Sequence, residues 1–190
     1  MVTSVWLYLG FLGLLYAERG AEVLVSRRNA RLAFAAGGVE GGRRHFTVMV
    51  AVHALFPLAC ADVVLTLLRG FPGVVGFAAL VVALAAQVVR WWVVRTLGRR
   101  WNTRIIVVPG AEPVTTGPYR FLRHPNYLAV MLEALSVPLI HGAWVSAIVF
   151  VSANAALLSV RIPVEELAQG ERYSRTFAGV PRFIPRGRNA

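Results

Sequence analysis

Long runs of apolar residues constrain this 190-residue chain more than any other feature of its sequence. About 20 mostly apolar residues suffice to cross a bilayer core roughly 30 Å thick. Runs of this kind lie at residues 2–17, 46–68, 71–94 and 127–160. The last run would form a helix of about 51 Å, which is too long for one crossing. Because Pro138, His141 and Gly142 interrupt its middle, we predict two antiparallel helices, at 127–140 and 143–160.

These segments predict the fold class. We expect an all-α integral membrane protein with five transmembrane helices, the last two forming a hairpin, in one domain covering residues 1–190. The first run lacks the positively charged start and the cleavage site of a secretory signal, so we expect it to remain as a span. A cytoplasmic cofactor-binding loop and a C-terminal segment complete the expected domain.

The distribution of charge separates a membrane protein from a nucleic-acid binder. The chain has 20 basic residues, all of them Arg, against 9 acidic residues, for a net charge of +11. Clusters of Arg follow the first, third and fifth predicted spans, whereas the other connections hold only Arg69 or none. This alternation predicts a multi-pass protein of the cell membrane with its N-terminus outside and its C-terminus in the cytoplasm. A nucleic-acid partner is not expected, because such a protein gathers its basic residues on one soluble face.

The common cofactor and metal motifs are missing from the sequence. Cys60 is the single cysteine, and the four His residues show no paired-ligand spacing, so we expect no metal. The sequence also contains no Walker A motif, no GxSxG and no GxGxxG after a strand.

Two segments on the predicted cytoplasmic side are too structured in composition to be simple linkers. The first contains a β-like stretch at 104–108, a Pro-Gly turn and the sequence GPYRFLRHPNY. Pro and Gly at this density fix the shape of a loop, as a site for a small polar ligand requires. The second begins RIPVEE, in which Arg161 and Glu165 are four residues apart and share one face of a helix.

The two segments together carry a family resemblance. GPYRFLRHPNY, an apolar hairpin and then RIPVEE…Y…F…VPRFIP resemble the isoprenylcysteine carboxyl methyltransferase family, integral membrane enzymes that use S-adenosylmethionine. Upstream, RRNARLAFAAGGVEGGRRHFTVMVAVH and LGRRWNTRIIVVPGAEPV are similar to one bacterial branch. That branch resembles the O-methyltransferases associated with type III polyketide synthases, which methylate alkylpyrones and phenolic lipids.

The resemblance implies a site for S-adenosylmethionine, with S-adenosylhomocysteine as product, at about residues 104–127 and 161–185. Arg161 and Glu165 are the implied catalytic pair, Arg161 meeting the anionic group of the substrate and Glu165 the cofactor. The stretch between Glu166 and Tyr173 is shorter than is usual in the family. The implied cofactor-binding residues are Ala111, Glu112, Pro113, Val114, Gly117, Tyr119, His124, Pro125, Asn126, Tyr127 and Glu165.

Ionisable residues inside predicted spans suggest where the substrate lies. Such residues are rare in membranes and often functional, so Glu133 and His53 join Arg161 as expected substrate-binding residues. The structural alternatives are a surface ion pair for Arg161 and Glu165, and a helix cap for His124.

The expected function is methyl transfer to a carboxylate or acidic hydroxyl of a lipophilic substrate that arrives from the bilayer. Such an oxygen is already largely anionic, so positioning and desolvation matter more than a strong base. The resemblance favours an alkylpyrone or phenolic lipid and a functional link to a type III polyketide synthase. The alternatives are carboxyl methylation of a prenylated cysteine and a non-catalytic membrane scaffold or transporter subunit; membrane lipids are partners in every case.

Overall fold

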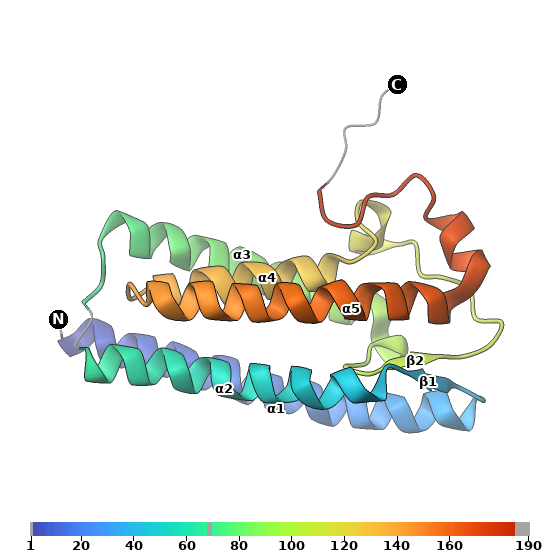
Figure 1. Ribbon diagram of the computed structural model, residues 1–190, viewed down its shortest axis with the longest axis horizontal. Helices are drawn as coiled ribbons and strands as arrows, with labels where there is room; N and C mark the ends of the chain where they lie inside the picture. Colours follow the sequence, from blue (N-terminus) through green and yellow to red (C-terminus); the bar gives the residue numbers. More distant parts are fainter. Residues whose placement is uncertain (1, 68–69, 185–190) are drawn as a thin grey trace.

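The computed structural model describes residues 2–67 and 70–184 and consists mainly of helices that run along one long axis (Figure 1). The end of the second predicted span (68), Arg69 and the end of the predicted cofactor region (185) lie outside the described residues. The five α-helices within the described ranges are α1 (Val2–Ala35), α2 (Arg43–Thr66), α3 (Val74–Leu97), α4 (Pro125–Leu139) and α5 (Trp144–Thr176).

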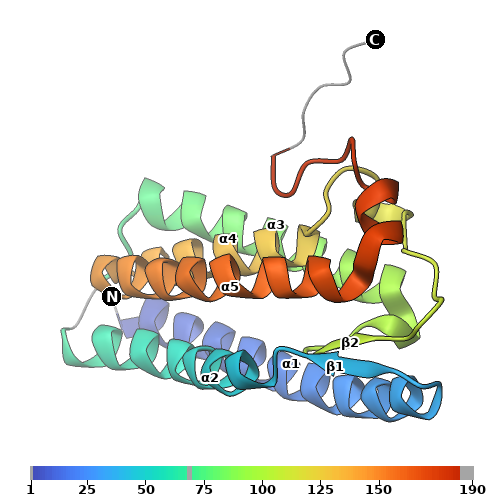
Figure 2. The same cartoon turned by 45° about the vertical axis from the view of Figure 1, so that its right-hand side comes forward.

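The helices pack in two layers. In both views α1 and α2 lie side by side beneath α3, α4 and α5 (Figures 1 and 2). Helix α4 packs against both α3 and α5, and α2 packs against α1 and α5. Helix α4 therefore has neighbours on several sides, which suits an apolar helix of only 15 residues.

Three segments within the described residues are long and apolar enough to cross a membrane, and they are His45–Thr66, Val74–Arg100 and Trp144–Thr176. Helix α4 is too short by this measure, and the apolar half of α1 ends at Glu18 and Arg19. The helical fold and these three candidate spans confirm the prediction of a mostly helical membrane protein. Five spans remain a prediction.

The helix boundaries follow local chemistry. Pro125 occupies the first turn of α4, where its missing N–H costs no hydrogen bond. The turn from Ile140 to Ala143 connects α4 to α5 and places Gly142 at φ +68°, a conformation that favours glycine. Helix α5 continues well beyond the predicted end of its span and bends at Gly170, where φ is +76°.

A short antiparallel sheet closes one end of the bundle. Its strands are β1 (Val39–Gly41) and β2 (Ile105–Val107), with Glu40 opposite Ile106. Strand β2 lies within the β-like stretch expected at 104–108. The segment 111–114, which the resemblance matched to a strand-like piece, is irregular. The turn at Pro109 and Gly110 ends the strand, and Pro113 has no N–H to donate to a ladder.

The bundle interior changes character along its length. Toward the N-terminal end lies an apolar core to which α1, α2, α3 and α4 contribute, including Tyr8, Val64 and Val137. The Tyr8 hydroxyl donates to the carbonyl of Val137 at 2.9 Å, which ties α1 to α4. Further along lies a set of charged and polar side chains that we call the ionic cluster, comprising Glu18, Arg19, Glu22, Gln87, Arg90, Trp91 and Glu133.

Candidate active site

The start of α4 and the middle of α5 bring the predicted site residues together. Tyr127 lies in the first turn of α4, and its hydroxyl donates to Glu165 on α5. Arg161 Nε donates to the same hydroxyl at 2.9 Å, and Arg161 Nη2 donates to the carbonyl of Thr103 at 2.6 Å. Arg161 is only 6% exposed. The Tyr127 phenol is therefore held between a buried cation and a carboxylate.

Glu166, the next residue of α5, organises a second group of charges. Its carboxylate lies 3.0 Å from His124 Nε2 and accepts two hydrogen bonds from Arg182, at 3.0 and 2.6 Å. The His124 ring stacks on Tyr127 with centroids 5.4 Å apart. The ring of His124 thus joins the Glu166 group to the Tyr127 group. His124 occupies the N-cap position of α4, as the structural alternative expects, but its side chain makes no capping hydrogen bond and lies against Glu166 instead.

The chain after α5, residues 178–184, folds back over the start of α4, and we call it the C-terminal strap. The backbone N–H of Arg123 donates to Pro181 at 2.9 Å, and that of His124 to Arg182 at 3.3 Å. Phe183 packs against the apolar cluster that contains Tyr127. The strap therefore covers the side of the site formed by His124 and Tyr127.

Tyr119 lies in a short 3-10 helix, η2 (Gly117–Arg120), beside the same charges. Burial raises the pKa of its phenol, and the neighbouring Glu165 and Tyr173 raise it further. Gly117 has φ +57°, and a Cβ there would collide with Thr96 of α3. Gly117 thus serves the close packing of the loop that positions Tyr119.

The segment 111–114 meets α5 one to two turns beyond Glu165. Glu112 pairs with Arg172 at 2.6 Å, and its carbonyl accepts from Arg100 at 2.5 Å. Ala111 lines a shallow pocket of about 410 Å³ together with residues of α5 that include Ala168 and Arg172. Pro113 and Val114 are half-buried. These four residues form a rim of the site and do not join the contacts around Tyr127.

Asn126 offers an unused acceptor next to Tyr127. Its Oδ1 is buried and has no hydrogen-bond partner within the described residues. A buried acceptor without a partner costs free energy, so such an atom points to a ligand or water that donates to it. Its neighbour Pro125 is fully buried and acts through packing.

Comparisons with known proteins decide the family. A model of the isoprenylcysteine carboxyl methyltransferase (ICMT) family matches residues 78–169, from within α3 to just before the bend at Gly170. The chain belongs to this family. Membership indicates a membrane methyltransferase.

Two relatives of the ICMT-family chain match over most of their own length. "Uncharacterized protein YpbQ" of Bacillus subtilis (strain 168) is 40% identical over 161 residues, covering 84% of this chain and 95% of the relative. An "Uncharacterized protein" of Haemophilus influenzae (strain ATCC 51907 / DSM 11121 / KW20 / Rd) is 25% identical over 163 residues, covering 84% and 93%. Their names identify no substrate.

Glu133 and His53 lie deeper in this ICMT-family bundle than Tyr127. Glu133 belongs to the ionic cluster and pairs with Arg19 at 3.2 Å. His53 Nδ1 lies 2.8 Å from the carbonyl of Met49, and the ring interacts electrostatically with Glu133, Arg19 and Arg161. His53 is thus within electrostatic range of both the ionic cluster and Arg161, and neither His53 nor Glu133 hydrogen-bonds to Arg161.

Sequence reasoning missed several residues that hold the site together. Glu166 and the carbonyl of Thr103 were not predicted, although each bonds to a predicted residue. Arg123, which pairs with Glu166, was not predicted either. Ser26 of α1 bonds to Thr103, with the two hydroxyl oxygens 2.8 Å apart. Apart from Glu133, Arg90 is the member of the ionic cluster that the sequence could have indicated, since a charged residue inside an apolar run is unusual.

Proposed function

We propose that this protein transfers a methyl group from S-adenosylmethionine to an oxygen of a lipophilic substrate at the membrane. The observation that carries the proposal is the position of Arg161 and Glu165, which both contact the Tyr127 hydroxyl where α4 begins. A cation and a carboxylate held side by side suit a reaction that brings an anionic oxygen to a cationic methyl donor. Family membership supports the same reaction class.

The residues around Tyr127 fit S-adenosylmethionine. The cofactor carries an ammonium group, an adenine amino group and ribose hydroxyls, all of which need acceptors, and Asn126 Oδ1 is a buried acceptor without a partner within the described residues. Glu165 and the rim segment 111–114 supply further acceptors. Tyr119, His124 and Tyr127 are the aromatic residues of the proposed cofactor site. When bound, the cofactor supplies a methyl group activated by a sulfonium.

Arg161 has one nitrogen left for the substrate. Its Nε and Nη2 are engaged by Tyr127 and Thr103, whereas Nη1 makes no hydrogen bond within the described residues. Because Arg161 is buried, a contact from Nη1 to an anionic oxygen is screened little by water. In the proposed reaction Arg161 orients the accepting oxygen, and the site needs no strong base for an oxygen that is already anionic.

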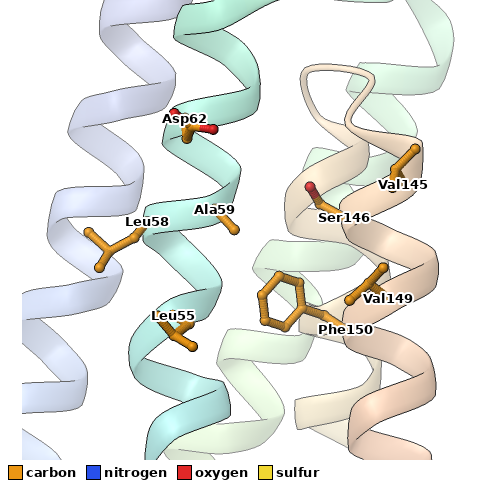
Figure 3. Close-up of a pocket in the computed structure, with 8 residues that line it drawn as sticks. All are labelled: Leu55, Leu58, Ala59, Asp62, Val145, Ser146, Val149 and Phe150. Atoms are coloured by element: carbon orange, nitrogen blue, oxygen red, sulfur yellow. The ribbon is translucent and has the colours of Figure 1, made fainter.

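The proposed substrate is an alkylpyrone or phenolic lipid, as the bacterial-branch segments favour. A lateral groove of about 530 Å³ lies between α2 and α5 and ends at Phe150, 11 residues before Arg161 on α5, so it suits the alkyl chain of such a lipid rather than its reacting oxygen. Leu55 and Leu58 of α2 and Val149 and Phe150 of α5 line it, and Asp62 and Ser146 are its polar residues (Figure 3). A functional link to a type III polyketide synthase belongs to the same proposal.

The proposed topology has five spans, with the N-terminus outside the cell membrane and the C-terminus in the cytoplasm. The distribution of Arg supports this orientation. Helix α4 would be about 22 Å long, shorter than the bilayer core, and its packing against α3 and α5 supports its place within the bundle. The proposed methyl-transfer site then lies at the cytoplasmic rim.

Isothermal titration calorimetry with S-adenosylhomocysteine tests the proposal. We expect saturable binding by the purified protein in detergent, and about ten-fold weaker binding by Glu165→Gln, since a charge-assisted hydrogen bond is lost. Glu171→Gln is the matched control, because Glu171 lies on the same helix and is 91% exposed. Well-folded protein that fails to bind S-adenosylhomocysteine would contradict the proposed function.

A further inference from the structure

The ionic cluster joins three helices inside the bundle. Arg90 of α3 donates two hydrogen bonds to Glu22 of α1, at 2.7 and 2.5 Å. Arg19 of α1 donates to Glu22 at 2.9 Å, to Gln87 of α3 at 3.1 Å and to Glu133 of α4 at 3.2 Å. Since Glu133 lies six residues beyond Tyr127 on α4, the cluster is about 9 Å further along the helix axis. It is therefore separate from the candidate active site.

The charges of the cluster do not balance. When all three are ionised, the carboxylates of Glu18, Glu22 and Glu133 face the two guanidinium groups of Arg19 and Arg90, which leaves one negative charge. The group that faces the cluster from α2 is His53, whose ring interacts electrostatically with Glu133 and Arg19. A buried site with surplus negative charge disfavours a further anion strongly, because little water is present to screen it.

One donor in the cluster has no partner. Arg90 is 6% exposed, and its Nη1 is buried without a hydrogen bond among the described residues. Its other nitrogens bond to Glu22, so the guanidinium is fixed within the cluster. A ligand oxygen would satisfy Nη1. Trp91, which is 52% exposed, and the side chains of Glu18 and Arg19, which are 23% and 22% exposed, are the most open part of the cluster and mark a path to it.

We propose that the ionic cluster binds the hydroxyl group of a neutral lipid head group. A hydroxyl accepts a hydrogen bond from Arg90 Nη1, donates one to a carboxylate of the cluster and adds no charge. A carboxylate head group would bring a second negative charge to the cluster. An ammonium head group would match the surplus charge but would leave Nη1 unsatisfied. This proposal does not depend on the proposed methyl transfer, although the hydroxyl lipid proposed there as substrate is one of the two occupants tested below.

Matched ten-carbon amphiphiles test the choice of head group. The full chain is placed in phosphatidylcholine nanodiscs at pH 8.5 and titrated calorimetrically with 1-decanol, decanoate and decylammonium, with empty nanodiscs subtracted. We expect saturable binding of 1-decanol at one site, about ten-fold tighter than either charged analogue. The absence of saturable 1-decanol binding would mean that the cluster only ties the helices together, and tightest binding of decylammonium would make it a cation site. Either outcome overturns the proposal.

Two substitutions test the assigned atoms. Arg90→Lys keeps the positive charge facing Glu22 but removes Nη1, so the affinity for 1-decanol should fall about ten-fold. Arg95→Lys, exposed on the same helix, should leave it unchanged. Glu133→Gln removes the surplus charge and keeps an acceptor for Arg19, so decanoate should gain affinity relative to 1-decanol. Circular dichroism checks the fold of each variant, and unchanged 1-decanol binding in folded Arg90→Lys contradicts the proposal.

Competition identifies the source of the hydroxyl. Displacement of 1-decanol by dioleoylglycerol identifies a membrane lipid, and displacement by a long-chain alkylphenol identifies the hydroxyl lipid proposed as substrate. Both results support a neutral hydroxyl site, whereas failure of both competitors overturns it. Binding of S-adenosylhomocysteine, measured on the same samples, tests the methyl-transfer proposal separately. Either proposal can therefore fail while the other holds.

Discussion

At the scale of single residues, Arg161 combines two contacts that fix its own position with one nitrogen that remains for a ligand. Its Nη2 bonds to the Thr103 carbonyl and its Nε to the Tyr127 hydroxyl. Both contacts restrain the planar guanidinium, so Nη1 projects in one direction without the entropic cost of a mobile side chain. The residue proposed to orient the substrate is thus organised before the substrate arrives.

Replacement of Arg161 should separate turnover from cofactor binding. We expect Arg161→Ala to reduce kcat at least about 100-fold on a verified lipid substrate, because the accepting oxygen loses its cation. Its Kd for S-adenosylhomocysteine should change less than about three-fold, because Glu165 is retained. Arg161→Lys should rescue little, since one ammonium cannot reproduce the planar fork.

The matched control is Arg175→Ala, on the same helix and 79% exposed at its side chain. This variant should keep full turnover. Retention of wild-type turnover by Arg161→Ala would remove Arg161 from the proposed mechanism.

At the scale of elements, α1 reaches the site through the loop that follows η1 (Gly98–Arg100). The amide of Thr103 donates to the Ser26 hydroxyl oxygen at 3.0 Å, and the Ser26 hydroxyl donates to Asn102 at 2.8 Å. Asn29, one turn later, donates to the carbonyl of Trp101 at 2.7 Å. The loop that presents the Thr103 carbonyl to Arg161 is therefore fixed by α1.

Ser26 should act as a positioning residue. We expect Ser26→Ala to lower kcat about ten-fold, because the Thr103 carbonyl loses its support and Arg161 its orientation. The Kd for S-adenosylhomocysteine should not move, and Ser26→Thr should restore most of the turnover since it keeps the hydroxyl. Ser159→Ala removes an exposed hydroxyl that bonds only to its own helix and serves as the control. Equal losses in Ser26→Ala and Ser26→Thr would indicate a packing effect instead.

The C-terminal strap should loosen when its ion pair is removed. Arg182 is 52% exposed at its side chain, so its bonds to Glu166 contribute about 1 kcal/mol at most after solvent screening. We expect Arg182→Gln to speed amide hydrogen exchange at Arg123 and His124 by up to about five-fold, because those amides donate to strap carbonyls. Arg175→Gln should not change the exchange. Unaltered exchange in Arg182→Gln would show that the backbone bonds alone hold the strap.

The sequence predicts the elements better than their contacts. Apolar length defines the helices, and the spacing of Arg161 and Glu165 predicts their shared face. Tyr127 was predicted as a cofactor residue, but its contact with both of them depends on how α4 packs on α5, which no spacing encodes. Strand β1 was missed because three residues show no periodicity, and the ionic cluster was missed because its members lie on separate helices.

At the scale of the whole molecule, the bundle is layered along its axis, from an apolar core through the ionic cluster to the candidate active site. Under the proposed topology the apolar core faces the outer leaflet and the site faces the cytoplasm. Helix α1 would be about 51 Å long, so its second half extends beyond the bilayer core, where it carries Arg27, Arg28 and Arg31 on its exposed surface.

Cysteine labelling should reveal the orientation. Cys60 is fully buried, so it should give little background. With a membrane-impermeant maleimide, we expect Phe71→Cys to react in intact cells and Ala111→Cys to react only after the membrane is opened. Both substituted residues are exposed in the structure. Labelling of Ala111→Cys in intact cells would reverse the proposed orientation.

The ion pairs between α1 and the later helices also affect the stability of truncated and chimaeric forms of this protein. The family match covers residues 78–169 and so excludes α1, which supplies the carboxylate that neutralises Arg90 and the cation that neutralises Glu133. A fragment that begins with α3 would leave both charges buried and unpaired, at a cost of about 3–5 kcal/mol for each. Chimaeras built from related chains should therefore exchange α1 and the family region together, so that both ion pairs are kept.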